Sequence, residues 1–104
     1  MGFNMQQMMK QAKMMQKKMA EIQEELKKME FEASAGGGAV KARVNGDQEV
    51  LEVKLDTDMI DADDLDMVED MVMVAVNDAL KQSKDEAKSK MSGLTGGMNV
   101  PGMF

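Results

Sequence analysis

Several residue types that carry chemistry are missing from the 104-residue sequence, which has no cysteine, histidine, tryptophan or tyrosine. Without cysteine or histidine the chain has no disulfide, thiol nucleophile, Cys/His zinc site or imidazole acid–base pair. No motif around its serines suggests a serine–lysine pair. We therefore predict a protein that is not an enzyme and that uses no catalytic residue, metal, cofactor or small-molecule substrate.

Long apolar runs are also missing. No stretch is long and apolar enough to cross a bilayer, and the first residues do not have the pattern of a secretory signal. We expect a single cytoplasmic domain over residues 1–104, with no membrane partner. Three phenylalanines are the only aromatic residues, which argues against a platform that stacks bases of single-stranded nucleic acid.

Methionine is abundant instead, with fifteen copies. From Met5 to Met29 the apolar residues recur at alternating spacings of three and four, which is the heptad pattern of a coiled-coil seam. No glycine or proline interrupts it, so residues 4–30 are predicted to form a helix. Such a helix is roughly 38 Å long, whereas a compact domain of this length has a radius of gyration near 13 Å.

Part of this helix should therefore overhang the body of the protein. We predict that its seam pairs with a second copy, and the alternative is packing on the chain's own second helix. The predicted dimer-interface residues are Met5, Met8, Met15, Met19, Ile22 and Leu26.

Charge is distributed unevenly along the chain. The net charge is −6, yet the first twenty residues contain four lysines and no acid, and residues 55–80 contain nine acids and no base. Lys10, Lys13 and Lys17 share one helical face opposite the seam, with Lys18 beside them. This stripe is either a solvated helix face or a surface for DNA phosphates.

From Phe31 the apolar period changes to two, which predicts three antiparallel strands within residues 31–56. Gly36-Gly37-Gly38 is expected to be a turn rather than a phosphate loop, because a strand follows it. With Gly46-Asp47 as a two-residue hairpin loop, the predicted facing pairs are Val40 with Val53, Ala42 with Leu51, and Lys41 with Glu52.

A second helix is predicted over residues 63–91, covering the sheet with its first half. The acidic residues 56–66 do not have the spacing of a calcium loop, so we expect Asp61 or Asp63 to cap this helix. Gly93 is expected to end it, and residues 93–104 read as a flexible glycine-rich tail.

The order of these elements, together with three segments, resembles the YbaB/EbfC family of small bacterial nucleoid-associated proteins. The segments are Ala-Gly-Gly-Gly-Ala-Val-Lys at 35–41, Ala-Val-Asn-Asp-Ala-Leu at 75–80, and the ending Gly-Leu-Thr-Gly-Gly-Met-Asn-Val-Pro-Gly-Met-Phe. Methionine stands at 71, 73 and 98, where relatives commonly have leucine. The resemblance implies an α+β protomer of order α-β-β-β-α, a tweezers-like homodimer, and binding that coats or compacts nucleoid DNA.

The family has no single base-reading motif, so the DNA-contacting residues are predicted from charge alone. The expected partner is double-stranded DNA, bound through its backbone with little sequence specificity, because the chain has one arginine. The candidate contacts are Lys10, Lys13, Lys17, Lys18, Lys41 and Arg43. The lysines at 84, 88 and 90 form a further candidate surface that nearby acids dilute. The alternative function is an acidic, methionine-rich dimer that binds proteins or acts like a chaperone.

Overall fold

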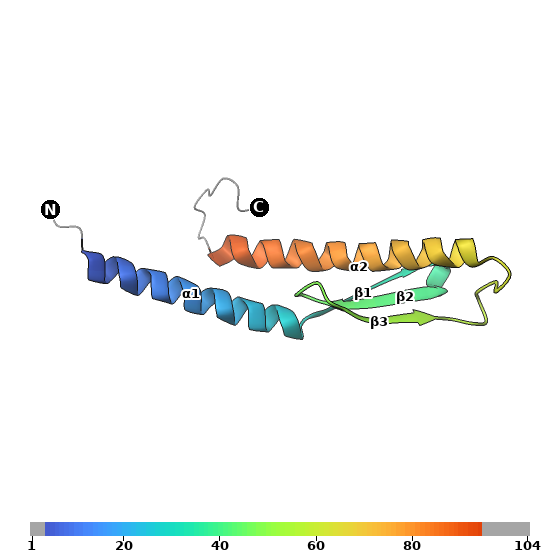
Figure 1. The fold of residues 1–104 in the computed structure, drawn as a ribbon, viewed down its shortest axis with the longest axis horizontal. Coiled ribbons are helices and arrows are strands. Elements are labelled where there is room, and N and C mark those ends of the chain that lie inside the picture. The colour runs from blue at the N-terminus through green and yellow to red at the C-terminus, as the bar shows by residue number, and fades with distance from the viewer. Residues whose placement is uncertain (1–3, 95–104) are drawn as a thin grey trace.

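The computed structural model describes residues 4–94 and shows a two-layer α+β protomer (Figure 1). Its elements, in chain order, are α1 (Met5–Lys28), β1 (Glu30–Ala35), the 3-10 turn η1 (Gly36–Gly38), β2 (Val40–Asn45), β3 (Val50–Leu55) and α2 (Leu65–Leu94). The sheet is antiparallel with strand order β1-β2-β3. The predicted fold class is confirmed.

Helix α1 is a long arm with defined ends. Asn4 caps its start, because the side-chain oxygen of Asn4 accepts a hydrogen bond from the Gln7 backbone N–H at 3.3 Å. The helix ends at Lys28, two residues before the predicted boundary, and Met29 is already extended. The N-terminal half of α1 projects past the end of α2, as Figure 1 shows.

The molecule is elongated because of this projection. Its principal extents are 74 × 24 × 16 Å and its radius of gyration is 19.8 Å, against about 13 Å for a compact domain of similar length. The predicted overhang is confirmed. No helix in residues 4–94 is both long and apolar enough to cross a membrane.

The turn between β1 and β2 requires glycine. Gly36, Gly37 and Gly38 all have positive φ angles, of 65°, 69° and 102°, a region that other residues adopt only with strain. The chain reverses there and pairs β1 with β2 so that Phe31 faces Val44 and Ala33 faces Ala42. The prediction of a turn at these glycines is confirmed.

The predicted register between β2 and β3 is wrong by two residues. Val40 faces Leu55, and Ala42 faces Val53. One residue of the shift comes from the loop, which is closed by a bond from the Asn45 N–H to the Glu49 carbonyl at 3.0 Å and so contains three residues. The other comes from a register shift between Arg43 and Val44, which leaves an extra residue in β3.

The Asn45 side chain explains why the loop is longer than a two-residue hairpin turn. Its oxygen accepts hydrogen bonds from the backbone N–H groups of Asp47 and Glu49, both at 3.0 Å. These bonds hold the wider turn and place Gln48 in the left-handed region, with φ of 64°. A three-residue loop that ends in this conformation is a common hairpin connection.

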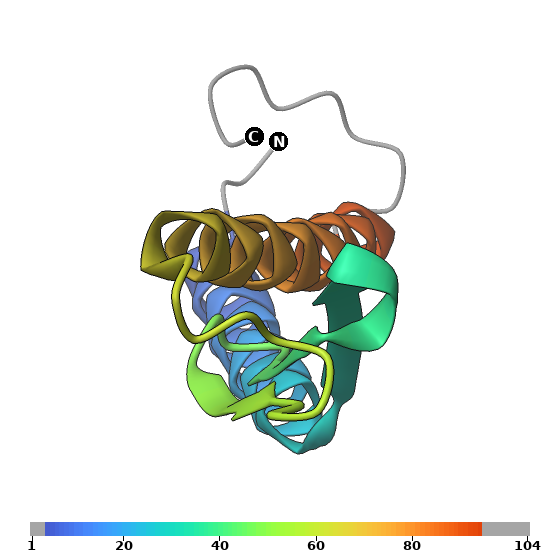
Figure 2. The same ribbon diagram turned by 90° about the vertical axis from the view of Figure 1, so that its right-hand side faces the viewer.

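Helix α2 covers one face of β1 and β2. The core between them contains small residues on the helix and alternating apolar residues on the strands: Ala33, Val40, Ala42, Val44, Ala75 and Ala79. Of the three strands, β3 lies furthest from α2 in both views (Figures 1 and 2). All six residues of β3 are exposed, so the predicted helix cover extends over two strands only.

The ends of α2 differ from the prediction. Asp64, not Asp61 or Asp63, caps the helix, since its side chain accepts a bond from the Met67 N–H at 3.3 Å. Asp61 instead bonds the Asp63 N–H at 2.9 Å in the preceding turn. The helix continues through Gly93 to Leu94, so Gly93 does not end it. The predicted flexible tail beyond this point lies outside the described residues.

Candidate nucleic-acid interface

The lysine stripe lies on the projecting half of α1. Lys10, Lys13, Lys17 and Lys18 are all exposed. Within residues 4–94 the ion pairs are those of Arg43, of Lys81 with Asp85 and of Lys90 with Glu25, so these four lysines have none. The first acid of α1 is Glu21. The stripe is therefore a free cationic surface.

Spacing along the helix suits the stripe to a row of phosphates. Lys10 and Lys17 are seven residues apart, which corresponds to roughly 10 Å along the helix axis. Duplex DNA carries about one charge per 1.7 Å of its axis, so about six phosphate charges lie within the same length. Long lysine side chains on a fixed helix can follow such a row without reading the bases.

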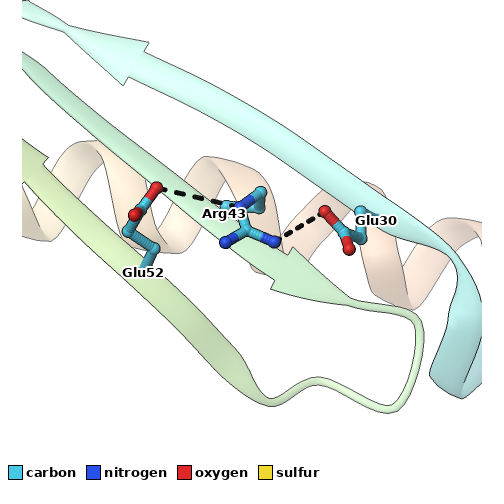
Figure 3. Close-up of polar contacts among 3 residues, drawn as sticks. All are labelled: Glu30, Arg43 and Glu52. Atoms are coloured by element: carbon cyan, nitrogen blue, oxygen red, sulfur yellow. Dashed lines mark hydrogen bonds and ion pairs between the residues drawn. The ribbon is translucent and has the colours of Figure 1, made fainter.

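Arg43 is paired within the protein. Its guanidinium lies on the outer face of the sheet between two carboxylates, donating to Glu30 at 2.6 Å and lying 3.8 Å from Glu52 (Figure 3). The hydrogen bond and the charge of Glu30 raise the pKa of Arg43 above its ordinary value. A DNA phosphate would have to displace Glu30, so the structure does not present Arg43 as a free cation.

Lys41 is exposed on the same outer face, directly opposite Lys54. Both lysines line a shallow groove that also contains Glu32 and Glu52. The groove therefore mixes cations and carboxylates, and Lys41 does not join the α1 stripe. The structure brings Lys10, Lys13, Lys17 and Lys18 together and leaves Lys41 and Arg43 on another element.

The further lysines on α2 are partly paired. Lys81 donates to Asp85 at 3.0 Å, which raises the pKa of Lys81, and Lys90 lies 3.2 Å from Glu25 of α1. The second of these pairs links the two helices where they run side by side. These contacts reduce the positive field of α2 relative to that of α1.

The methionine seam of α1 has two parts. Met5, Met8 and Met15 are 70%, 52% and 42% exposed, whereas Leu26 is only 6% exposed inside the protomer. Met19 and Ile22 are half-buried. The C-terminal part of the seam thus packs within the chain, and the N-terminal part is open. Pairing of the seam with a second copy stays a prediction.

A close contact at Gly46 holds α1 in place. The Gly46 N–H donates to the Leu26 carbonyl at 2.7 Å, and a Cβ at Gly46 would clash with that oxygen. The neighbouring Asn45 carbonyl accepts a bond from the buried Ser83 hydroxyl of α2 at 2.7 Å. The hairpin turn therefore fixes both helices, and with them the direction of the lysine stripe.

The sequence of the chain matches a model of the YbaB/EbfC DNA-binding family over residues 1–98. The chain belongs to the YbaB/EbfC DNA-binding family. It is 47% identical over 103 residues to a nucleoid-associated protein of Clostridium novyi, covering 99% of this chain and 90% of that protein. A nucleoid-associated protein of Thermoanaerobacter pseudethanolicus is 45% identical, with coverage of 99% and 93%.

The solved structure of an uncharacterized protein from Helicobacter pylori has the same fold, with a TM-score of 0.83. It is 22% identical and covers 91% of this chain and 100% of its own. The family model and the two nucleoid-associated relatives confirm the predicted membership of the YbaB/EbfC DNA-binding family. No group of acidic residues within positions 4–94 is arranged to hold a metal ion.

Reasoning from the sequence of this YbaB/EbfC chain missed one surface. The apolar side chains of β3 are 40–47% exposed: Val50, Leu51, Val53 and Leu55. The second helix was expected to cover the apolar face of the whole sheet, and nothing in the sequence signals that α2 stops short of β3. We call these four residues the β3 surface.

Proposed function

We propose that this YbaB/EbfC protein binds duplex DNA as a homodimer, through Lys10, Lys13, Lys17 and Lys18, with little sequence specificity. The observation that carries the proposal is an exposed, acid-free lysine stripe on a projecting helix, in a chain whose family is DNA-binding. The stripe contacts phosphates, and phosphate contacts position a protein without reading sequence. Many dimers along one duplex would coat and compact it.

Little sequence specificity follows from the side chains available. Arginine pairs with guanine in the commonest specific contact, and the one arginine is held by Glu30 and Glu52. Lysine on a helix surface contributes charge without a fixed fork of donors. Unrelated duplexes of equal length should therefore bind with similar affinity.

Charge reversal tests the stripe. Lys10→Glu, Lys13→Glu and Lys17→Glu together should weaken duplex binding at low salt on the order of a hundredfold, because each change replaces a phosphate contact with repulsion. The matched control reverses Lys27, Lys28 and Lys54, which are also exposed and give the same net charge. Fluorescence anisotropy with a labelled duplex measures both. Equal loss in the two variants would show that total charge, not the stripe, governs binding.

We propose the β3 surface as the dimer interface, and the α1 seam that the sequence predicts remains the alternative interface. Strand β3 is at the edge of the sheet, so its outer backbone groups have no neighbouring strand among residues 4–94. Val53 and Leu55 lie opposite the fully buried Ala42 and Val40, yet remain about 40% exposed because α2 does not reach them. A second copy placed about a twofold axis would cover these side chains with identical ones and leave both α1 arms free, as in tweezers.

Charged substitutions on each candidate surface test where the dimer forms. Val53→Asp should convert the dimer to a monomer, because a carboxylate would lie inside the apolar contact. Lys54→Asp, the next residue on the opposite face of β3, is the control and should leave the mass unchanged. Met8→Asp with Met15→Asp tests the α1 seam in the same way. Light scattering after size exclusion gives each mass, and loss of the dimer in the seam variant alone would place the interface on α1.

The methionine-rich alternative is an outcome of these tests. Exposed methionines on α1 and α2 favour a protein-binding surface, because Met adapts to varied apolar partners. Failure of the wild-type dimer to bind duplex DNA at low salt would favour that function over DNA binding.

A further inference from the structure

One methionine of α1 lies within the lysine stripe rather than on the seam. Met14 follows Lys10 by four residues and precedes Lys17 by three, so these three side chains share one face of the helix. Lys13 and Lys18 lie on the two sides of this face. Met14 is therefore surrounded by four lysines that have no ion pair among residues 4–94.

The protomer makes little use of Met14 for packing. Its side chain is 53% exposed, and it is absent from the core and from the apolar residues packed against that core. The next residue, Met15, points toward the seam about 100° further around the helix. On the side of α2, Met14 and Leu94 border a hollow of about 240 Å³. A single exposed methionine is ordinary on a protein surface, but this one lies at the centre of the cationic face.

We propose that Met14 makes the apolar part of the duplex contact, against the deoxyribose carbons that lie between the phosphates bound by the lysines. This contact rests on the proposed DNA binding by the stripe and adds a contribution that charge does not supply. The lysines extend their ammonium groups to the phosphates on both sides, so the side chain between them meets the sugars. Methionine suits an irregular apolar surface, because its side chain is unbranched and flexible.

A contact with sugars agrees with low sequence specificity. Every nucleotide of DNA has the same deoxyribose, so an apolar side chain packed on it does not distinguish the bases. The thioether of Met14 is at most a weak hydrogen-bond acceptor, and it cannot form the paired hydrogen bonds by which side chains read base edges. Met14 should therefore raise the affinity for all duplexes alike.

Salt separates this apolar contact from the phosphate contacts. Phosphate contacts release counterions and so determine the slope of log K against log salt. Burial of apolar surface releases no counterions. Replacement of Met14 by another neutral side chain should therefore lower log K by a similar amount at every salt concentration, without changing the slope.

The test variant is Met14→Gln in the full-length chain, because glutamine is neutral and forms helices about as well as methionine. Its duplex affinity should be about fivefold lower than that of the wild type, with the same salt slope. Met14→Leu retains an apolar side chain and should bind nearly as well as the wild type. Met73→Gln is the matched control, since Met73 is 57% exposed on α2, and it should bind like the wild type. Fluorescence anisotropy with a labelled duplex gives each affinity, and circular dichroism checks that helix content is equal.

The possible failures have different signatures. Wild-type affinity of Met14→Gln at every salt concentration would overturn the apolar contact and leave the phosphate contacts standing. A changed salt slope in this variant would overturn it too, because Met14 would then act through the neighbouring lysines. Equal losses in the glutamine and leucine variants would also contradict an apolar contact. Absence of wild-type binding at low salt would instead reject DNA binding itself, and the Met14 contact with it.

Discussion

The two helices of this protein differ in how far their apolar residues are buried. Helix α1 has the more regular apolar spacing, yet only Leu26 is buried in it. Helix α2 has a less regular pattern, yet it buries Val68, Ala75, Ala79 and Ser83. The helix that holds the core thus contacts the sheet through small side chains, and the helix with the coiled-coil pattern keeps most of its seam open.

The two helices also differ in the sign of the charge in their first halves. The first half of α1 has lysines and no acid, whereas the first half of α2 has acids and no base. Folding and the proposed DNA binding are thus divided between the helices: α2 and the sheet hold the core, and α1 projects a cationic face from the body. Substitutions should therefore affect stability strongly in α2 and weakly in the projecting half of α1.

The largest expected effect comes from enlarging a small residue of α2. Ala79 is fully buried against the sheet, so Ala79→Leu should lower the free energy of unfolding by about 3 kcal/mol through overpacking. Met8→Leu on α1 should change it by less than about 0.5 kcal/mol. Urea denaturation of both variants measures the difference. Similar losses of unfolding free energy in the two variants would contradict the different roles of the two helices.

A smaller effect is expected where α1 is attached. Gly46→Ala places a Cβ against the Leu26 backbone and should cost about 2 kcal/mol, through lost packing and the lost hydrogen bond. Amide exchange should rise at the C-terminal turn of α1 more than in α2. Gly93→Ala is the control: its Cβ would meet nothing within 4 Å, so it should stabilise α2 by up to about 1 kcal/mol. A Gly46→Ala protein as stable as the wild type would contradict the attachment.

The smallest effect concerns the hairpin turn alone. Gln48 has a φ of 64°, so Gln48→Gly should raise the free energy of unfolding by at most about 1 kcal/mol, because glycine adopts this conformation without strain. The side chain of Gln48 is exposed and contributes no core contact. Thermal unfolding detects the gain as a small rise in Tm. A clear loss of stability would show that the turn depends on the glutamine.

Much of the fold follows from local patterns in the sequence. The heptad spacing predicts α1, the three glycines predict a turn, and the alternation from Phe31 predicts strands. The strand register does not follow, because a side chain, Asn45, selects the loop length and an irregularity adds another residue. Likewise Gly46 signals a turn, but its close contact with Leu26 arises only once α1 and the hairpin meet.

The sequence likewise predicts the parts of the candidate site that depend on one helix, but not those that depend on contacts between elements. The lysine stripe depends on the period of one helix, so the sequence places its members on a common face. Arg43 looked equally available, but Glu30 reaches it across the β1–β2 pairing and Glu52 across the β2–β3 pairing. The open side of β3 depends on how far α2 extends over the sheet, which is a property of packing rather than of sequence period.

Duplex affinity across a salt series is the most direct test of the proposed binding of α1 to backbone phosphates. The sample is the wild-type protein with its mass in solution known, and the ligands are two unrelated duplexes of equal length. We expect similar affinities for both duplexes, with log K falling against log salt with a slope of about −3 to −5, as for three to six phosphate contacts. No binding at low salt, or binding that salt does not weaken, would contradict it.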